Sequence, residues 1–259
     1  VVNTSNTSQT ATITVTPTYD NNGVVCIGTP ELFTITVNPN AQVDSLESWN
    51  TVACDGDFTP TYIFTTSNTD GTTSYEWTNN NPAIGLAESG SGGIPSFSAT
   101  NSSNTTITAT ITVTPTYNNN GLSCSGTADT FTITVNPSPQ VDEVQDIVLC
   151  NNEDSEIITF TTSNTDGTTT YNWTNDNPSI GLAASGTGDI PSFTATNPSI
   201  VSDGALITVT PTYDNNGIVC VGNPETFSIT VLSEIVVSGT PSDAVDCNDP
   251  NSGDIDLLV

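Results

Sequence analysis

The sequence predicts an all-β protein made of tandem β-sandwich repeats in an elongated array. Three observations lead to this prediction. A long motif recurs about every 97 residues, apolar residues alternate with threonines, and turn signals follow one another closely. No segment has a helical period long enough to predict a helix.

The internal repeat sets the expected domain boundaries. The string TPTY begins at positions 16, 114 and 210, so successive copies are 98 and 96 residues apart. The match covers ITVTPTYDNNGVVCIG (13–28), ITVTPTYNNNGLSCSG (111–126) and ITVTPTYDNNGIVCVG (207–222). Each copy ends in a strand followed by a linker, and the first two linkers contain proline. We therefore expect the C-terminal part of a sandwich at 1–38, complete sandwiches at 39–137 and 138–232, and the start of another repeat at 233–259.

One copy contains enough short strands for an immunoglobulin-like sandwich. Strict alternation marks residues 106–117, with an apolar set of Ile107, Ala109, Ile111, Val113 and Tyr117. The same pattern recurs at Phe131, Ile133 and Val135. Shorter strands are expected at TYIFTT, TSYEW and PSFSAT, and the pairs Asp70-Gly71 and Asn120-Gly121 predict turns with positive φ. About seven strands in about 97 residues is typical of this sandwich.

The aromatic residues of the YxW segment have two interpretations. Trp77 and Trp173, with Tyr75 and Tyr171, are expected to be core aromatic residues of a central strand. The alternative is an exposed aromatic platform that binds carbohydrate. Burial of the two tryptophans would argue against the platform.

The charge composition excludes several classes of function. The 259 residues include no Lys, Arg or His, against 28 Asp and Glu, for a formal net charge of -28. Binding to nucleic acid, or to anionic lipid through a basic segment, needs the cations that this chain lacks. No apolar run is long enough to span a bilayer, so direct membrane insertion is not expected. General acid–base catalysis would fall to carboxylates, tyrosines or thiols, and no catalytic constellation is evident. We therefore expect a protein that is not an enzyme.

The cysteines predict disulfides in an oxidising compartment. Pairs within copies, Cys54–Cys124 and Cys150–Cys220, and pairs between neighbours, such as Cys124–Cys150, both fit the repeat. In such a sandwich the loop before the last strand is expected at the same pole as the first strand's start, which favours the pairs within copies. A disulfide requires Cα atoms within about 7 Å. Cys26 and Cys247 would then remain, and their partners are expected upstream and downstream in a longer polypeptide.

Calcium is the one candidate cofactor. Carboxylates cluster near the expected boundary between the two complete copies, and hard cations prefer such oxygen ligands. The acids of this cluster are Asp142, Glu143, Asp146, Glu153, Asp154 and Glu156. A second cluster comprises Asp243, Asp246, Asp249, Asp254 and Asp256. The alternative for both sets is solvated linker acids, and no EF-hand pattern is present.

The combined motifs resemble the PKD-like repeats of giant surface adhesins from gliding Bacteroidota. The resemblance rests on an early cysteine, the YxW strand, VTPTY, the NNGxxCxG loop and the closing FTITVNP, and it covers about 230 residues. DCNDPNSGDIDLLV (246–259) is similar to the opening of a SprB-type repeat. The resemblance implies a type IX-secreted stalk or filament module at the extracellular cell surface, with a role in gliding motility or attachment. Implied partners are neighbouring repeats, surface glycans and the motility machinery. A carbohydrate-binding module is the alternative function.

Overall fold

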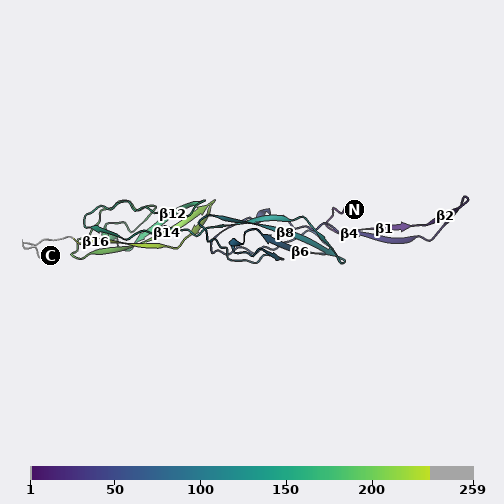
Figure 1. The fold of residues 1–259 in the computed structure, drawn as a ribbon, viewed down its shortest axis with the longest axis horizontal. Coiled ribbons are helices and arrows are strands. Elements are labelled where there is room, and N and C mark those ends of the chain that lie inside the picture. The colour runs from purple at the N-terminus through teal and green to yellow at the C-terminus, as the bar shows by residue number, and fades with distance from the viewer. Residues whose placement is uncertain (1, 234–259) are drawn as a thin grey trace, which may run out of the picture. The chain divides into compact units, whose positions relative to one another are not determined.

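A computed structural model describes residues 2–233, which form an all-β chain with three single turns of 3-10 helix (Figure 1). The turns are Glu47–Trp49, Pro82–Ile84 and Pro178–Ile180. The chain forms two compact units. Unit 1 comprises residues 1–139, 164–168 and 213–220, and unit 2 comprises 140–163, 169–212 and 221 onward. Two short segments of the second complete sequence copy therefore pack within unit 1.

Unit 1 is organised around a six-stranded sheet. Its order is β5 (Thr51–Cys54), β10 (Asp129–Asn136), β8 (Ile107–Asn119), β6 (Thr72–Asn79) and β7 (Ser89–Ser91), and β9 (Leu122–Ser125) also pairs with β8. The β5–β10 pair is parallel, and the other pairs are antiparallel. Figure 1 shows β8 and β6 lying along one another in this unit.

Strand β8 has the predicted alternation. Ala109, Ile111, Val113 and Tyr117 are completely buried, while the threonines between them face outward. The inward set of β10 is also buried, as predicted: Phe131, Ile133 and Val135. Outward threonines pair across the strands, with the hydroxyls of Thr108 and Thr134 lying 3.0 Å apart. The alternation thus divides each strand into a core face and a polar face.

The layer opposite this sheet is less regular than the sequence predicts. Tyr62 and Ile94 exchange two backbone hydrogen bonds of 2.8 and 2.9 Å, but they form an isolated bridge rather than continuous strands. The segments TYIFTT and PSFSAT therefore contribute single bridges. Pro60 and Pro95 lack the N–H groups that a longer ladder needs. The side chains of Tyr62, Phe64 and Ile94 nevertheless pack on the sheet and complete a sandwich-like core.

The predicted turns form as glycine and asparagine allow. Asn120 and Gly121 have φ values of 50° and 78° and join β8 directly to β9. Positive φ at both central residues defines the tight hairpin turn whose twist matches the flanking strands. Asp70 likewise has a φ of 66°.

Unit 2 repeats the same strand order. Its sheet is β11 (Ile147–Cys150), β16 (Glu225–Leu232), β14 (Asp203–Asn215), β12 (Thr168–Asn175) and β13 (Ser185–Thr187), with β15 (Ile218–Val221) paired to β14. Its core is the counterpart of the first, with Ile207, Phe227 and Ile229 buried. The long strand β14 continues into unit 1, which contains its last three residues and most of β15.

The N-terminal region forms two short antiparallel pairs within unit 1. These are β1 (Gln9–Val15) with β4 (Glu31–Val37), and β2 (Thr18–Asn21) with β3 (Val24–Ile27) (Figure 1). Ile13 and Phe33 correspond in the repeat to the buried Ile111 and Phe131, yet they are 37% and 49% exposed. Among residues 2–233, the apolar positions of this copy are thus less covered than their counterparts in the later copies.

Candidate functional site

A disulfide joins two different copies of the sequence repeat. Cys54, the last residue of β5, bonds to Cys220 of β15, with Cα atoms 5.6 Å apart and a sequence separation of 166. Both cysteines belong to unit 1. Cys124 and Cys150 are free thiols in the described structure. The predicted pairs Cys54–Cys124 and Cys150–Cys220 are therefore wrong.

The sheet register explains the error. Cys54 ends the first strand and aligns with Asn136 at the end of β10, beside the start of β8 at Ile107. Cys124 lies opposite Tyr117, near the far end of β8. Ten residues of extended strand separate the two ends, which is about 33 Å at about 3.3 Å per residue. The predicted pairing requires Cys54 to lie at the start of the first strand, whereas Cys54 is the last residue of β5 and lies at the other end of the sheet from Cys124.

Side-chain hydrogen bonds surround the hairpin that carries Cys220. The Nδ2 of Asn215 donates to Thr106 Oγ1 at 3.0 Å and to Asn136 Oδ1 at 3.1 Å. The hydroxyl of Tyr213, whose ring is completely buried, donates to the carbonyl of Thr165 at 2.8 Å. It also lies 3.2 Å from the hydroxyl of Thr106. The hairpin is thus held against the strand ends near Cys54.

The same set of contacts occurs again, one copy earlier, in unit 1. The Nδ2 of Asn119 donates to Ser8 Oγ at 2.7 Å and to Asn38 Oδ1 at 3.3 Å. The hydroxyl of Tyr117 donates to the carbonyl of Thr69 at 2.7 Å and lies 3.5 Å from Ser8 Oγ. The second and third TPTY hairpins therefore each contact the strand ends of the preceding sequence copy. We did not predict this role, although the identical TPTY and NNG strings in three copies are the sequence signal for it.

The remaining described cysteines carry no disulfide. Cys26 in β3 and Cys150 in β11 are exposed, whereas Cys124 in β9 is partly buried. Cys247 lies outside the described residues.

The tryptophans of the YxW strands lie in the two cores. Trp77 and Trp173 are 6% and 3% exposed. Each indole packs against a glycine of the neighbouring strand, Gly90 and Gly186 respectively. Tyr171 is buried, and the partly buried Tyr75 packs against the first core. Because both indoles are enclosed, they cannot form the exposed aromatic platform of the alternative interpretation.

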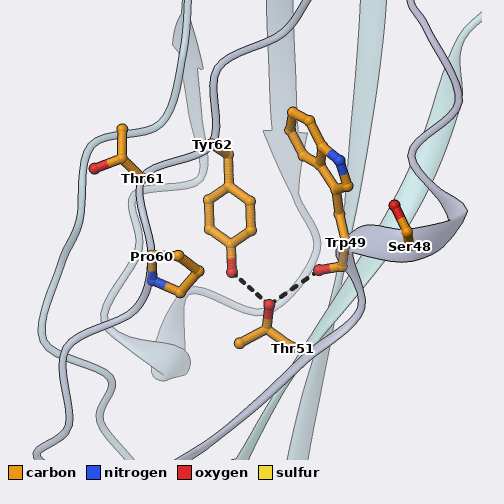
Figure 2. Close-up of a pocket in the computed structure, with 6 residues that line it drawn as sticks. All are labelled: Ser48, Trp49, Thr51, Pro60, Thr61 and Tyr62. Carbon is orange, nitrogen blue, oxygen red and sulfur yellow. Dashed lines mark hydrogen bonds between the residues drawn. The ribbon is translucent and has the colours of Figure 1, made fainter.

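A small surface hollow adjoins the first core (Figure 2). It has a volume of about 230 Å³ and is lined by Ser48, Trp49, Thr51, Pro60, Thr61 and Tyr62. Trp49 lies in the stretch where the first complete copy is two residues longer than the second. Its ring stacks on that of Phe64 at a centroid distance of 5.5 Å. The Thr51 hydroxyl accepts from the Tyr62 hydroxyl at 2.9 Å and donates to the Trp49 carbonyl at 3.0 Å (Figure 2).

Two hydrogen bonds connect three of the residues that line this hollow, Trp49, Thr51 and Tyr62. Burial raises the pKa of Tyr62, and its hydrogen bond with Thr51 opposes that rise in part. No carboxylate or thiol lines the hollow, so it has no acid–base pair and no activated nucleophile. Trp49 was not predicted as a core aromatic residue, because it has no counterpart in the second complete copy.

Four of the six predicted calcium ligands accept separate hydrogen bonds in the fold, and the other two, Glu143 and Glu156, are exposed. Within residues 2–233, no three acidic, cysteine or histidine side chains gather closely enough to hold a metal ion. The acids that accept hydrogen bonds from neighbouring backbone or hydroxyl groups are Asp142, Asp146, Glu153 and Asp154. The amide and side chain of Ser228 hold the pKa of Asp146 below its ordinary value. The second acidic set, at 243–256, lies outside the described residues.

None of the helices within residues 2–233 is long and apolar enough to cross a membrane.

No family model and no curated protein matches the sequence. Among solved structures, the chain is similar to mouse cadherin-23 EC22-24, with 12% identity and a TM-score of 0.36 over 88% of this chain and 74% of that one. It is also similar to protocadherin gamma B2 extracellular cadherin domains 1-5, with 11% identity and a TM-score of 0.34 over 89% and 46%. Tandem Ig repeats of Dlar match with 10% identity and a TM-score of 0.25 over 71% and 94%. Likeness at this level identifies no relative, so the all-β, sandwich-like class rests on the strands described above.

Proposed function

We propose that the chain is a non-catalytic, structural stalk module of a large secreted cell-surface adhesin. The observation that carries this proposal is the disulfide between Cys54 and Cys220, which ties the first strand of one sequence copy to the hairpin of the next. Such a bond adds nothing to the chemistry of a site. It does limit how far the chain can extend under tension.

The position of the disulfide gives it a mechanical role. The strands from β6 to β14 all lie between Cys54 and Cys220, inside the loop that the bond closes. Tension applied to the two ends of the chain passes from Cys54 to Cys220 through the sulfur atoms. The strands inside the loop are therefore shielded, and they cannot be pulled straight while the bond is intact.

Composition and redox chemistry support an extracellular location. A structural disulfide persists in oxidising compartments, and an acidic chain without cations stays soluble through like-charge repulsion. The motif resemblance supports a finer proposal: a type IX-secreted gliding or attachment adhesin whose partners are neighbouring repeats, surface glycans or the motility machinery.

Single-molecule force spectroscopy tests the stalk proposal. The full chain is pulled by its termini with and without reductant. The closed loop holds 166 residues, so reduction should add about 580 Å to the fully extended length at about 3.5 Å per residue. The oxidised chain should show no extension steps from the strands inside the loop.

Two matched variants sharpen the experiment. Cys54→Ser should extend without reductant as far as the reduced native chain, whereas Cys124→Ser, which removes a free thiol, should behave as the native chain. An oxidised native chain that extends as far as the reduced chain would refute the proposed mechanical role.

A further inference from the structure

Strand β4 has one open edge. In the six-stranded sheets, the matching strands β10 and β16 each pair with a long antiparallel strand on one side and with a short parallel strand on the other. The short strands are TVAC (β5) and IVLC (β11), and both end in cysteine. Strand β4 pairs with β1 on one side, and among the described residues no strand pairs with its other side.

The hairpin that carries Cys124 contacts the residue after β4 in the same way that the hairpin that carries Cys220 contacts the last residue of β10. The contacts of Asn119 with Ser8 and Asn38 reproduce those of Asn215 with Thr106 and Asn136. Asn38 directly follows β4, just as Asn136 ends β10 opposite Cys54. A parallel strand on β4 would therefore end beside Cys124.

One backbone hydrogen bond also occurs at matching positions beside the two hairpins. The amide of Thr69 donates to the carbonyl of Asn6 at 2.9 Å, and the amide of Thr165 donates to the carbonyl of Asn104, also at 2.9 Å. Side chains and backbone thus place the hairpin of Cys124 in the same way as the hairpin of Cys220.

We propose that the open edge of β4 binds an extended strand ending in cysteine, parallel to β4, and that Cys124 forms a disulfide with this cysteine. The occupant is a first strand of a repeat of this kind, with the T-V-A-C or I-V-L-C pattern, as β5 is for β10 and β11 is for β16. This inference goes beyond the stalk proposal, because it stands on repeated geometry and not on where the protein works.

The chemistry combines strand addition with thiol oxidation. Main-chain hydrogen bonds supply the affinity, and alternate side chains supply the specificity. Two thiols lose two protons and two electrons as the sulfur–sulfur bond forms. A disulfide oxidant such as oxidised glutathione accepts the electrons and leaves as two thiols.

Cys26 provides an internal control. It lies opposite Tyr19 in β3, the position that Cys124 holds opposite Tyr117 in β9. Cys26 is exposed and Cys124 is partly buried. Exposure alone therefore predicts faster reaction at Cys26, whereas strand binding predicts faster reaction at Cys124.

The test uses the full chain and a peptide of residues 47–57, ESWNTVACDGD, whose cysteine is capped with glutathione. The thiolate of the protein attacks the peptide sulfur, and glutathione leaves as a thiol. Pepsin digestion and mass spectrometry then locate the attached peptide. We expect attachment to Cys124 about tenfold faster than to Cys26, the effect of one or two net backbone hydrogen bonds.

Three controls decide the result. A scrambled peptide of the same composition should lose the preference for Cys124. Asn119→Ala should also lose it, because the hairpin is no longer held at Asn38, while the matched Asn21→Ala in the Cys26 hairpin should keep it. Equal preference with the scrambled peptide, or faster attachment to Cys26 or Cys150 in the native chain, would overturn the proposal. An unchanged preference in Asn119→Ala would contradict the positioning of Cys124 by that contact.

Discussion

Replacing Gly90 by alanine should destabilise the first sandwich core. Gly90 in β7 lies opposite Trp77 in β6, and an added Cβ would come within 2.2 Å of the indole Cζ2. Ordinary van der Waals contact begins near 3.4 Å, so the ring would have to move by about 1.2 Å. Trp77 is 6% exposed and belongs to the buried core, where movement of the ring would disturb its neighbours.

The expected cost follows from two opposing terms. Overpacking of a filled core costs about 1–3 kcal/mol. Alanine also restricts the unfolded chain, which offsets about 0.4–1 kcal/mol. The midpoints of the two terms give a fall of about 1.3 kcal/mol in the free energy of unfolding, measured by urea denaturation with tryptophan fluorescence.

Two variants frame this measurement. Ser91→Ala, at an exposed position of the same strand, should change the free energy of unfolding by less than about 0.5 kcal/mol. Gly186→Ala should destabilise unit 2, because its Cβ would meet Trp173 at the same 2.2 Å. A Gly90→Ala chain as stable as the native one would refute this account of indole packing.

Three further predictions concern hydrogen bonds, the disulfide and pH. Tyr117→Phe should lower the free energy of unfolding by about 0.5–1.5 kcal/mol, because the hydrogen bond from the buried tyrosine to the carbonyl of the exposed Thr69 is lost. An unchanged urea denaturation curve would argue against this contribution. Cys54→Ser should lower it by about 5 kcal/mol in the chain-entropy model for a 166-residue loop, and reductant should bring the native chain to the same value but leave the variant unchanged. The pKa of Asp146 lies below its ordinary value of 3.8, because the backbone amide and the side chain of Ser228 in β16 hydrogen-bond to the carboxylate. The carboxylate therefore stabilises the folded state above pH 3.8, and this stabilisation is lost as the pH falls through the folded pKa. Asp146→Ala should therefore flatten thermal stability against pH below about 4, and an unchanged profile would exclude this contribution.

The strands and turns of the core were predictable from the sequence. The alternation at Ile111, Val113 and Phe131 fixes which face of each strand is buried, because side chains alternate across a sheet. The Asn120-Gly121 turn follows from the positive φ that only such residues adopt easily. The opposite layer was overpredicted as continuous strands, because its prolines interrupt the ladder that alternation alone suggests.

The cysteine pairing could not be obtained from alternation. It depends on whether Cys54 begins or ends its strand, and on the parallel pairing of β5 with β10. The sequence of a four-residue strand such as TVAC does not show whether it pairs parallel or antiparallel to its neighbour. The contacts of Asn119 and Asn215 with Asn38 and Asn136 could not be predicted either, because they join residues 79 or more positions apart. The asparagines lie next to turn motifs that are typical of exposed loops.

Trp49 shows a third kind of difficulty. The copies differ by two residues near this position, and an insertion near a domain start suggests a surface edge. The insertion forms the 3-10 turn Glu47–Trp49, which lies at the surface, and it also directs the indole onto Tyr62 and Phe64. A local length difference indicates where the backbone changes, and the packing partners depend on the opposing layer.

Disulfide mapping of the oxidised full chain tests the central claim most directly. Pepsin digestion at low pH limits thiol–disulfide exchange, because the attacking thiolate is scarce there, and mass spectrometry identifies the linked peptides. The account predicts a linked pair containing Cys54 and Cys220, with no link from Cys54 to Cys124. Linked pairs of Cys54 with Cys124 and of Cys150 with Cys220 would contradict the connection between sequence copies and, with it, the stalk mechanism.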